Sequence, residues 1–287
     1  MFHLLCNNIT KVSYPLIFLG ITCGSLKAET RPSAKHVPQR VISIDYCADQ
    51  YLLKLGTSSQ ILGVSPKSMA SFSFMREKAK NFNKVRATTE ELLALRPDLI
   101  IRSFGGGVGV NKFLKHHKIP ILQIGRLDSL EDITQTIVNI SNALGNDELG
   151  ITLVHELNRR LLSITRAEEK STALYIAAGG VTTGEGTLVH DIMSKGNLLN
   201  IVDTQGWRDI PLEQLASLRP DIIVHSYLGD LTKNSGKWSA IHHPVTKRFL
   251  LSNAAIAIPP ALVSCGAWYS LEAVEMISRV QRKHTVH

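Results

Sequence analysis

The chain has 287 residues, of which 44% are hydrophobic and 20% charged, and its 32 lysines and arginines exceed its 24 acidic residues to give a formal net charge of +8. This length accommodates two domains, each able to bury a core without help from a metal ion or a disulfide, and the composition is that of a soluble globular protein. The basic residues are scattered and no basic stripe interleaved with aromatic residues occurs, so nucleic acid is not expected as a partner.

The N-terminal segment, residues 1–28, has the features of a secretory signal peptide. Lys11 precedes an apolar stretch, from Val12 to Leu26, that ends in small residues, and cleavage is expected after Ala28. The alternative, a permanent membrane anchor, needs about 20 apolar residues, which is more than this stretch provides. Residues 29–39 are polar and contain prolines, so we expect a flexible lead-in to the folded part.

Residues 40–128 are predicted to form an N-terminal α/β lobe. Short apolar runs alternate with segments of helical periodicity, an order typical of a parallel sheet with right-handed crossovers. The expected elements are a strand RVISID (40–45), a helix ADQYLLKLG (48–56), a strand ILGVS (61–65), a loop with one short helix (66–86), a helix and a strand in TEELLALRPDLII (89–101), a glycine turn and helix in GGGVGVNKFLKHHKI (105–119) and a strand IPILQIG (119–125).

Residues 129–170 show helical periodicity with no strand signal, and the pattern is interrupted near Gly145 and Asn146. Asp147 is a suitable N-cap for a second helix of about 22 residues, which at 1.5 Å per residue would be about 33 Å long. A helix of that length can bridge two lobes.

Residues 171–287 are predicted to form a C-terminal α/β lobe that matches the first. The expected elements are a strand and glycine turn TALYIAAGG (172–180), a helix and a short strand in TLVHDIMSKGNLLNIV (187–202), a helix and a strand in LEQLASLRPDIIV (212–224), a strand AAIAIPP (254–260) and a closing amphipathic helix WYSLEAVEMISRVQ (268–281).

One segment of the first lobe returns in the second. TEELLALRPDLIIRSFGG at 89–106 and LEQLASLRPDIIVHSYLG at 212–229 share a glutamate (Glu90 and Glu213), an Arg-Pro-Asp corner, an apolar strand, and a serine followed by an aromatic residue. In both copies proline stops the helix, and the strand has the pattern of one buried on both faces. We therefore predict two halves of like construction, with ligand-binding loops at the carboxyl ends of their parallel strands.

The loops at these strand ends carry the candidate ligand-binding residues. Aromatic side chains there suit a large, flat or partly apolar ligand such as a corrin, a porphyrin or an aryl chelate, although each can equally cap the core of its own lobe. Arg126 can pair with a ligand carboxylate or be a solvated surface charge. The candidates are Tyr46, Cys47, Phe104, Gly105, Arg126, Gly180, Thr183, Tyr227, Cys265 and Trp268.

Two of the four cysteines, Cys6 and Cys23, are expected to leave with the signal peptide, so that Cys47 and Cys265 remain, one in each lobe. In an oxidising compartment these two can form a disulfide that locks the lobes. Separate thiolates can instead contact a ligand or ligate a metal or haem iron, and two small buried side chains are the third alternative. The sequence leaves all three open.

The chain carries no motif typical of an enzyme site, and no catalytic residue is predicted. The glycine turn GGGVG lacks the last glycine of G-x-G-x-x-G because Val110 stands there, and neither a G-x-x-x-x-G-K-S/T loop nor a G-x-S-x-G elbow occurs. A nucleophile pair of Cys47 and His190 stays open as an alternative. Adjacent histidines on a helix, such as His116 and His117, point in different directions, so no resident metal or cofactor is predicted.

In this order, the motifs resemble those of the solute-binding proteins of ATP-binding-cassette (ABC) importers for cobalamin and iron chelates. The resemblance covers most of the mature chain and rests on RVISIDYCADQYLLKLG, EELLALRPDLII, LYIAAGGVTTGEGTLVHDIMSKGNLLNIV, LEQLASLRPDIIV and VSCGAWYSLEAV. It implies an α/β fold of two Rossmann-like lobes with parallel central sheets, joined by one long rigid helix, and a ligand cleft between the lobes with little hinge closure.

The resemblance also implies a function. A periplasmic receptor of this family, here expected to be a monomer, captures a metal chelate such as cobalamin or another corrinoid, an iron-siderophore or haem, and delivers it to an inner-membrane ABC permease with its ATPase. One carboxylate per lobe docks on permease arginines, a position that falls on Glu90 and Glu213, although the helix macrodipole alone also favours glutamate there. The alternatives are an exported thiol-dependent enzyme or a non-transport haem or corrinoid carrier that uses Cys47 and Cys265 in the cleft.

Overall fold

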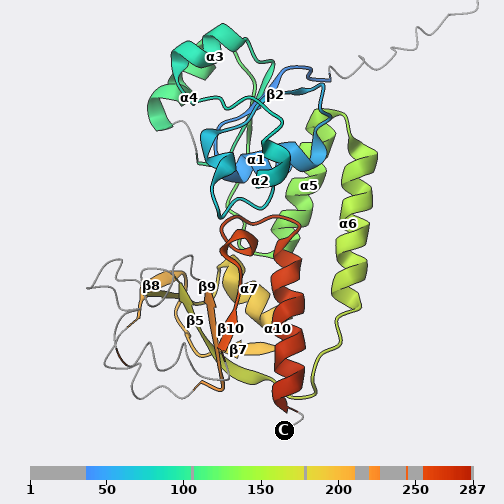
Figure 1. The fold of residues 1–287 in the computed structure, drawn as a ribbon, viewed down its shortest axis with the longest axis vertical. Coiled ribbons are helices and arrows are strands. Elements are labelled where there is room, and N and C mark those ends of the chain that lie inside the picture. Colours follow the sequence, from blue (N-terminus) through green and yellow to red (C-terminus); the bar gives the residue numbers. More distant parts are fainter. Residues whose placement is uncertain are drawn as a thin grey trace, which may run out of the picture. The chain divides into compact units, whose positions relative to one another are not determined.

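Two four-stranded parallel sheets, covered by helices, are the main elements of the fold (Figure 1). The structure is a computed structural model, and it describes residues 37–104, 107–177, 180–210, 220–226, 244 and 255–285. The expected signal peptide and almost all of the lead-in lie outside the described residues, as do Gly105, Glu213 and Tyr227. The described residues all belong to one unit, residues 37–287.

The first sheet has the strand order β2-β1-β3-β4, and every pair in it is parallel. Strands and helices alternate along the chain as predicted, and the expected loop at 66–86 contains two short helical segments rather than one. The elements are β1 (Val41–Ser43), α1 (Tyr46–Leu55), β2 (Ile61–Gly63), η1 (Pro66–Met69), α2 (Arg76–Ala79), α3 (Thr89–Leu95), β3 (Leu99–Arg102), α4 (Gly107–His116) and β4 (Ile121–Gln123).

The central strands of this sheet are buried on both faces, which explains their unbroken apolar runs. Successive side chains of a strand point to opposite faces. Val41 and Ile101 therefore pack in the core that contains α1, whereas Ile42 and Ile100 pack in a second core with side chains of α3 and α4. Full burial of each such side chain contributes roughly 1.5–3 kcal/mol, so the sheet is held by its two helical layers.

The second sheet repeats the order of the first. Its strands follow as β10-β9-β5-β7, all parallel, so that β5, β7, β9 and β10 correspond to β1, β2, β3 and β4. Two further strands, β6 and β8, pair antiparallel in a separate two-stranded sheet, which the sequence pattern did not predict. The elements are β5 (Ser171–Ala177), β6 (Val181–Thr183), α7 (Leu188–Lys195), β7 (Leu198–Asn200), β8 (Trp207–Asp209), β9 (Ile222–Ser226), β10 (Ala255–Ala257), η3 (Pro260–Leu262) and α10 (Ser270–Thr285).

The aspartate of the repeated Arg-Pro-Asp corner makes equivalent hydrogen bonds in both halves. The Asp98 carboxylate, just before β3, accepts hydrogen bonds from the backbone N–H groups of Gln39 (2.7 Å) and Arg40 (2.9 Å) at the start of β1. The Asp221 carboxylate, just before β9, accepts one from the backbone N–H of Thr172 (2.7 Å) at the start of β5. Each aspartate thus joins the beginnings of two neighbouring strands, which gives a physical reason for the motif.

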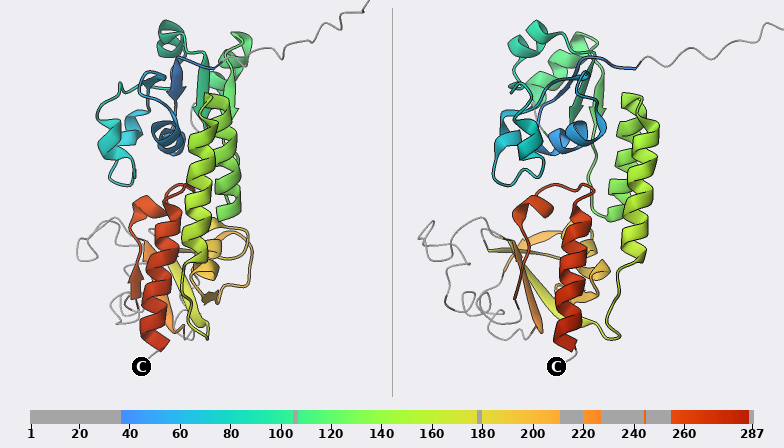
Figure 2. Two further views of the ribbon diagram at one scale, coloured as in Figure 1. Left: turned by 90° about the vertical axis from the view of Figure 1, so that its right-hand side faces the viewer. Right: turned by 45° about the vertical axis from the view of Figure 1, so that its right-hand side comes forward.

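Two antiparallel helices, α5 (Leu130–Leu144) and α6 (Asp147–Leu162), connect the sheets along the chain and lie side by side (Figures 1 and 2). The expected helix of about 22 residues from Asp147 is shorter: α6 has 16 residues, or about 24 Å. Beyond Leu162, the carbonyl groups of Thr165, Ala167 and Glu169 accept hydrogen bonds from side chains of α10 and Asn197, which replace the bonds of a continued helix. A helix pair therefore takes the place of one long helix.

The helix pair is tied to the first sheet's elements at one end. The Gln60 side chain donates to the carbonyl of Leu144 at the end of α5 (2.8 Å). The Asn146 side chain donates to the carbonyl of Leu55 at the end of α1 (2.7 Å). Both bonds use carbonyl groups that a helix end leaves unpaired.

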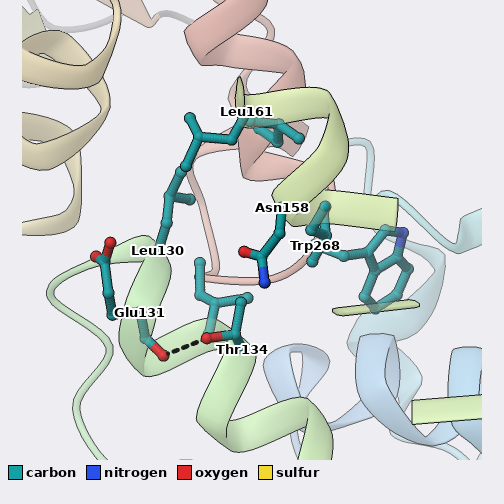
Figure 3. A pocket seen from close by; sticks show the side chains of 9 residues that line it. Leu130, Glu131, Thr134, Asn158, Leu161 and Trp268 are labelled. Atoms are coloured by element: carbon teal, nitrogen blue, oxygen red, sulfur yellow. Dashed lines mark hydrogen bonds between the residues drawn. The ribbon is translucent and has the colours of Figure 1, made fainter. Parts of the chain in front are cut away.

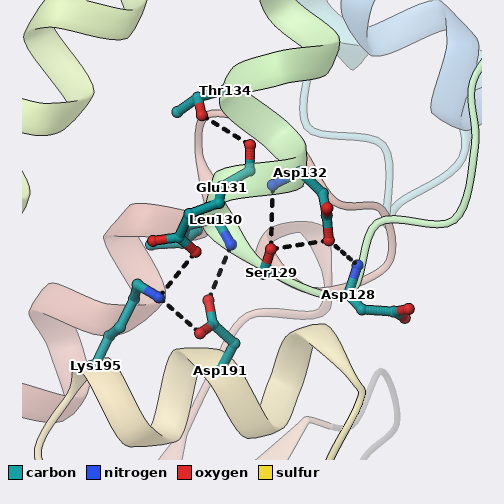
Figure 4. A network of polar contacts seen from close by, with 8 residues as sticks. All are labelled: Asp128, Ser129, Leu130, Glu131, Asp132, Thr134, Asp191 and Lys195. Carbon is teal, nitrogen blue, oxygen red and sulfur yellow. Dashed lines mark hydrogen bonds and ion pairs between the residues drawn. The ribbon is translucent and has the colours of Figure 1, made fainter.

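The other end of the pair is tied to the second sheet's helices. The Asp191 carboxylate of α7 accepts the backbone N–H of Leu130 (2.9 Å), and Lys195 binds both Asp191 (2.7 Å) and Glu131 (3.1 Å), as Figure 4 shows. Arg160 of α6 makes two hydrogen bonds to Glu275 of α10, of 3.0 and 2.8 Å. The helix pair is therefore held by side-chain hydrogen bonds at both of its ends.

No helix in the described part of the chain has the length and apolarity to cross a bilayer.

Candidate ligand site at the strand ends

The carboxyl edge of the first sheet is organised by Asp45, the N-cap of α1. One oxygen of its carboxylate accepts the backbone N–H of Ala48 (2.9 Å), and the other accepts the backbone N–H groups of Ser103 (2.7 Å) and Phe104 (3.1 Å). Asp45 is 5% exposed. The loop after β3 is thus bound to the first turn of α1.

A second carboxylate, Asp49, holds the other strand ends one turn further along α1. It accepts hydrogen bonds from the hydroxyl groups of Ser43 and Ser65 and from the backbone N–H of Ser65 (2.9 Å). Burial raises the pKa of Asp49 to about 7 and the nearby charge of Asp45 adds to this, although its hydrogen bonds to both serines lower the pKa. The two aspartates together fix the carboxyl ends of β1, β2 and β3.

Three aromatic side chains gather at this edge, and we call Tyr46, Phe72 and Phe104 the aromatic cluster. The ring of Tyr46 contacts those of Phe72 and Phe104 edge to face, with centroids 4.9 and 5.2 Å apart. Phe104 is 54% exposed, so one face of the cluster is open. Burial, and secondarily the charge of Asp45, raises the pKa of the Tyr46 phenol. The sequence pattern identified Tyr46 and Phe104 as candidates but not Phe72.

Cys47 and Cys265 form a disulfide with a Cα–Cα distance of 5.4 Å. Of the three alternatives that the sequence left open, the structure contains the disulfide. Cys47 lies in the first turn of α1, after β1, and Cys265 lies between η3 and α10, after β10. The bond therefore brings the carboxyl edges of the two sheets together, and neither sulfur is a free thiolate.

Trp268, predicted to be a stacking residue, is instead part of the packing beside this disulfide. It is 7% exposed, and its indole lies edge to face with the rings of Tyr51, Phe74 and Tyr269. The Tyr51 hydroxyl also donates to the carbonyl of Gly266 (2.8 Å). Residues 264–269, which we call the clasp, thus pack on α1 and the loop around Phe74, and Trp268 offers little surface to a ligand.

The remaining candidates are engaged locally. Gly180 is buried with a φ of 80°, a conformation that favours glycine. Thr183 is buried and its hydroxyl pairs with that of Thr187 (2.6 Å). Arg126 is exposed, pairs with Asp128 and donates to the carbonyl of Gly186 (3.2 Å). None of these three residues therefore provides a buried polar group that is available to a ligand.

One exposed aromatic residue at the second sheet was not among the sequence candidates. Trp207 of β8 is 54% exposed, and its ring lies 6.0 Å from that of Tyr175 in β5. Burial raises the pKa of Tyr175 to about 12. The sequence carried no specific signal for this position, because single large apolar side chains are common on protein surfaces.

A small, partly open cavity lies elsewhere, between α5, α6 and α10. Leu130, Thr134, Asn158 and Trp268 are among the residues that line it (Figure 3). Its volume of about 40 Å³ has room for a few water molecules and is far below the several hundred Å³ of sites for drug-sized ligands. In the described residues, no three His, Cys, Asp or Glu side chains are grouped as metal ligands.

Comparison with known proteins identifies the family. The model of the family described as periplasmic binding protein matches residues 41–246. The chain belongs to the periplasmic binding protein family. The search of curated protein sequences finds no match.

Solved structures support the two-lobed fold of this family. A periplasmic heme binding protein from Pseudomonas aeruginosa is 18% identical, with a TM-score of 0.67 over 86% of this chain and 94% of that one. The periplasmic vitamin B12 binding protein of Vibrio cholerae is 19% identical, with a TM-score of 0.66 over 87% and 99%. An ABC-type Fe³⁺-hydroxamate transport protein from Saccharomonospora viridis is 16% identical, with a TM-score of 0.63 over 85% and 93%. The predicted α/β fold with two parallel sheets is confirmed.

Proposed function

We propose that the protein is a periplasmic receptor that captures a metal chelate and delivers it to an ABC importer. The chelate is a corrinoid such as cobalamin, an iron-siderophore or haem. The observation that carries this proposal is the open aromatic cluster at the carboxyl edge of a parallel sheet, in a chain of the periplasmic binding protein family. Ligands of open α/β sheets bind at such edges.

The chemistry of the edge favours a large ligand with apolar faces. The cluster around Tyr46 and Phe104 provides ring surface, and Trp207 adds an exposed indole at the second sheet. Similar structures include proteins for haem, vitamin B12 and an Fe³⁺-hydroxamate, three metal chelates of this size class. Aromatic contacts bury apolar surface of a ligand but do not select one particular chelate. The substrate is therefore proposed as a class.

Capture is proposed to take place in a preformed site. The helix pair α5 and α6 is bonded to elements of both sheets, and the disulfide joins the two carboxyl edges. Such ties oppose hinge closure, so the ligand would meet surfaces already in position and lose little affinity to reorganisation. Release would then depend on the transporter.

Docking to the permease is assigned to Glu90 and Glu213. Glu90 lies in the first turn of α3 and is fully exposed, and its own backbone N–H and the hydroxyls of Thr89 and Thr88 lower the pKa of its carboxyl group. It therefore stays ionised and open to an arginine partner. Charge reversal of both glutamates should abolish uptake and leave ligand affinity unchanged, whereas Glu91→Lys next to the site should spare both.

The protein is proposed not to be an enzyme. The pair of Cys47 and His190 would need a free thiolate, and Cys47 is in the disulfide. His190 lies with its Nδ1 3.3 Å from the side-chain amide of Asn200. No observation on the described residues favours a catalytic role over binding.

A ligand screen tests the proposal. The mature protein would be titrated with cobalamin, cobinamide, haemin and a ferric hydroxamate, and the melting temperature and tryptophan fluorescence would be followed. A ligand that binds the native state raises the melting temperature by mass action. Binding of one chelate at micromolar affinity or better supports the proposal. A protein that binds none of the four, while its folded state is intact, contradicts it.

A further inference from the structure

Asp45 lies between the two segments that carry the half-buried ring of Tyr46 and the exposed ring of Phe104. It directly precedes Tyr46, and its carboxylate binds the backbone N–H of Phe104. The rings of these two residues are 5.2 Å apart and form the open part of the aromatic cluster. One buried side chain therefore contacts the main chain on both sides of the proposed ligand surface.

The two oxygens of this carboxylate have separate tasks. One caps α1 through the N–H of Ala48, and the other receives the N–H groups of Ser103 and Phe104. A carboxylate that accepts backbone N–H groups makes charge-assisted bonds, and such bonds are what compensates the burial of a charge. Capping would occur with serine as well, but only a longer acceptor reaches the loop after β3.

The ring of Phe104 needs this anchor because packing does not hold it. With 54% of Phe104 exposed, its side chain is not locked in a core, and its position depends on where the main chain of residues 103 and 104 lies. Asp45 bonds the N–H of both residues. The side-chain amide of Gln123 still donates to the carbonyl of Ser103, so loss of the Asp45 bonds would loosen the loop at Phe104 and with it the ring.

We infer that Asp45 is a positioning residue for ligand capture: its carboxylate latches the Ser103–Phe104 main chain to the first turn of α1 and so presets the aromatic cluster. The inference rests on the proposed function for its consequence in binding, but the latch itself is a property of the free protein. Its two parts can therefore be tested separately.

The chain offers a matched control in Asp98. This carboxylate also accepts two backbone N–H groups, from Gln39 and Arg40, but it does so before β3, at the opposite end of the same strand. Asp98→Asn and Asp45→Asn remove the same chemistry from the two ends of one sheet. Asp45→Ser keeps the cap on Ala48 and removes only the latch.

The first measurement is amide hydrogen exchange on the free full-length mature protein. In Asp45→Ser, the amides of Ser103 and Phe104 should exchange about tenfold faster or more, because their acceptor is gone. The amide of Ala48 should stay protected, and Asp98→Asn should affect Gln39 and Arg40 instead. Unchanged exchange at Ser103 and Phe104 in both Asp45 variants would overturn the inference.

The second measurement is affinity for cobalamin, cobinamide, haemin and the ferric hydroxamate. Asp45→Ser should bind the chelate of the wild-type protein about tenfold more weakly, since an unlatched ring must be ordered on binding, whereas Asp98→Asn should stay within about twofold. Equal affinity of Asp45→Ser and wild type refutes the positioning role. If the wild type binds none of the four, the proposed function fails, and the exchange experiment still decides whether the latch exists.

Discussion

Cys47 and Cys265 are bonded across a sequence separation of 218 residues, and they stand at the carboxyl edges of two different sheets. The clasp around Cys265 adds noncovalent contacts to the same region, including the hydrogen bond from Tyr51 to Gly266 and the stacking of Phe74 on Tyr269 at 4.2 Å. The disulfide thus lies beside a packed interface, which would keep the two edges in contact even without it.

Removal of this disulfide should reduce stability strongly while the fold persists. In the chain-entropy account, a loop of this length contributes up to about 5 kcal/mol by restricting the unfolded chain. Cys47→Ser, Cys265→Ser and the double variant should therefore lose similar amounts of unfolding free energy in urea titrations. Each should retain the circular dichroism of the wild type at low temperature.

The reductant dependence supplies the control. Dithiothreitol should lower the melting temperature of the wild type to that of the double variant and should not affect the double variant itself. A wild type that is as stable with reductant as without, although thiol titration shows two reduced cysteines, would contradict this prediction.

Because of Asp49, the free energy of unfolding should decrease as the pH rises from about 4 to about 7. Its pKa is about 7 in the folded protein, against about 3.9 for an exposed aspartate, so in this window the folded state holds a proton that the unfolded state has lost. The stabilisation by protonated Asp49 is fully present below about pH 4, is lost as the pH approaches 7 and stays lost above it. Its size is up to about 4 kcal/mol of unfolding free energy.

The variant Asp49→Asn tests this relation, because its amide can accept one serine hydrogen bond and donate another but cannot ionise. Its unfolding free energy should change less between pH 4 and pH 7 than that of the wild type, in urea titrations at several pH values. Asp98→Asn serves as the control for the same substitution elsewhere in the sheet. Parallel pH profiles of Asp49→Asn and wild type would refute the prediction.

Local patterns in the sequence were sufficient for the aspartate and the strand that the two copies of the repeat share. The Arg-Pro-Asp corner recurs with the same register because Asp98 and Asp221 each bind the start of a neighbouring strand, a local requirement. The pairing of β6 with β8 was missed because these strands have three residues each and are separated along the chain by a helix and a further strand. Such pairing depends on tertiary contacts that no short window contains.

The candidate site was predictable only in part for a related reason. A position at a strand end selected Tyr46 and Phe104, which lie in the aromatic cluster, and also Trp268, which belongs to the clasp and is buried. The same rule did not select Trp207, which is exposed. Whether an aromatic ring at a strand end points to ligand or to core depends on its neighbours in space. For Trp268 these are Tyr51 and Phe74, more than 190 residues earlier in the chain.

Gly150 should be intolerant of a methyl group because α5 and α6 approach closely there. A Cβ at residue 150 would lie 1.9 Å from the hydroxyl oxygen and 2.5 Å from the Cβ of Ser141. Gly150→Ala is therefore expected to destabilise the protein by about 1–3 kcal/mol, as overpacking does. Gly109→Ala in α4, where a Cβ would meet nothing within 4 Å, should instead be neutral or slightly stabilising. Equal melting temperatures of the two variants would contradict this, because they would show that α5 and α6 can move apart without a loss of stability.

The ion pair between Arg160 and Glu275 should couple α6 to α10 by a measurable amount. Its two hydrogen bonds form a bidentate contact, and the side chains are 27% and 29% exposed, so water screens the pair only in part. A double-mutant cycle of Arg160→Met and Glu275→Gln, read by urea unfolding, should give a coupling energy of about 1 kcal/mol. The exposed pair of Glu77 and Lys80 on the surface of the same molecule should show almost none, since both side chains are more than half exposed. A coupling as small for Arg160 and Glu275 as for Glu77 and Lys80 would mean that apolar packing alone holds α6 against α10.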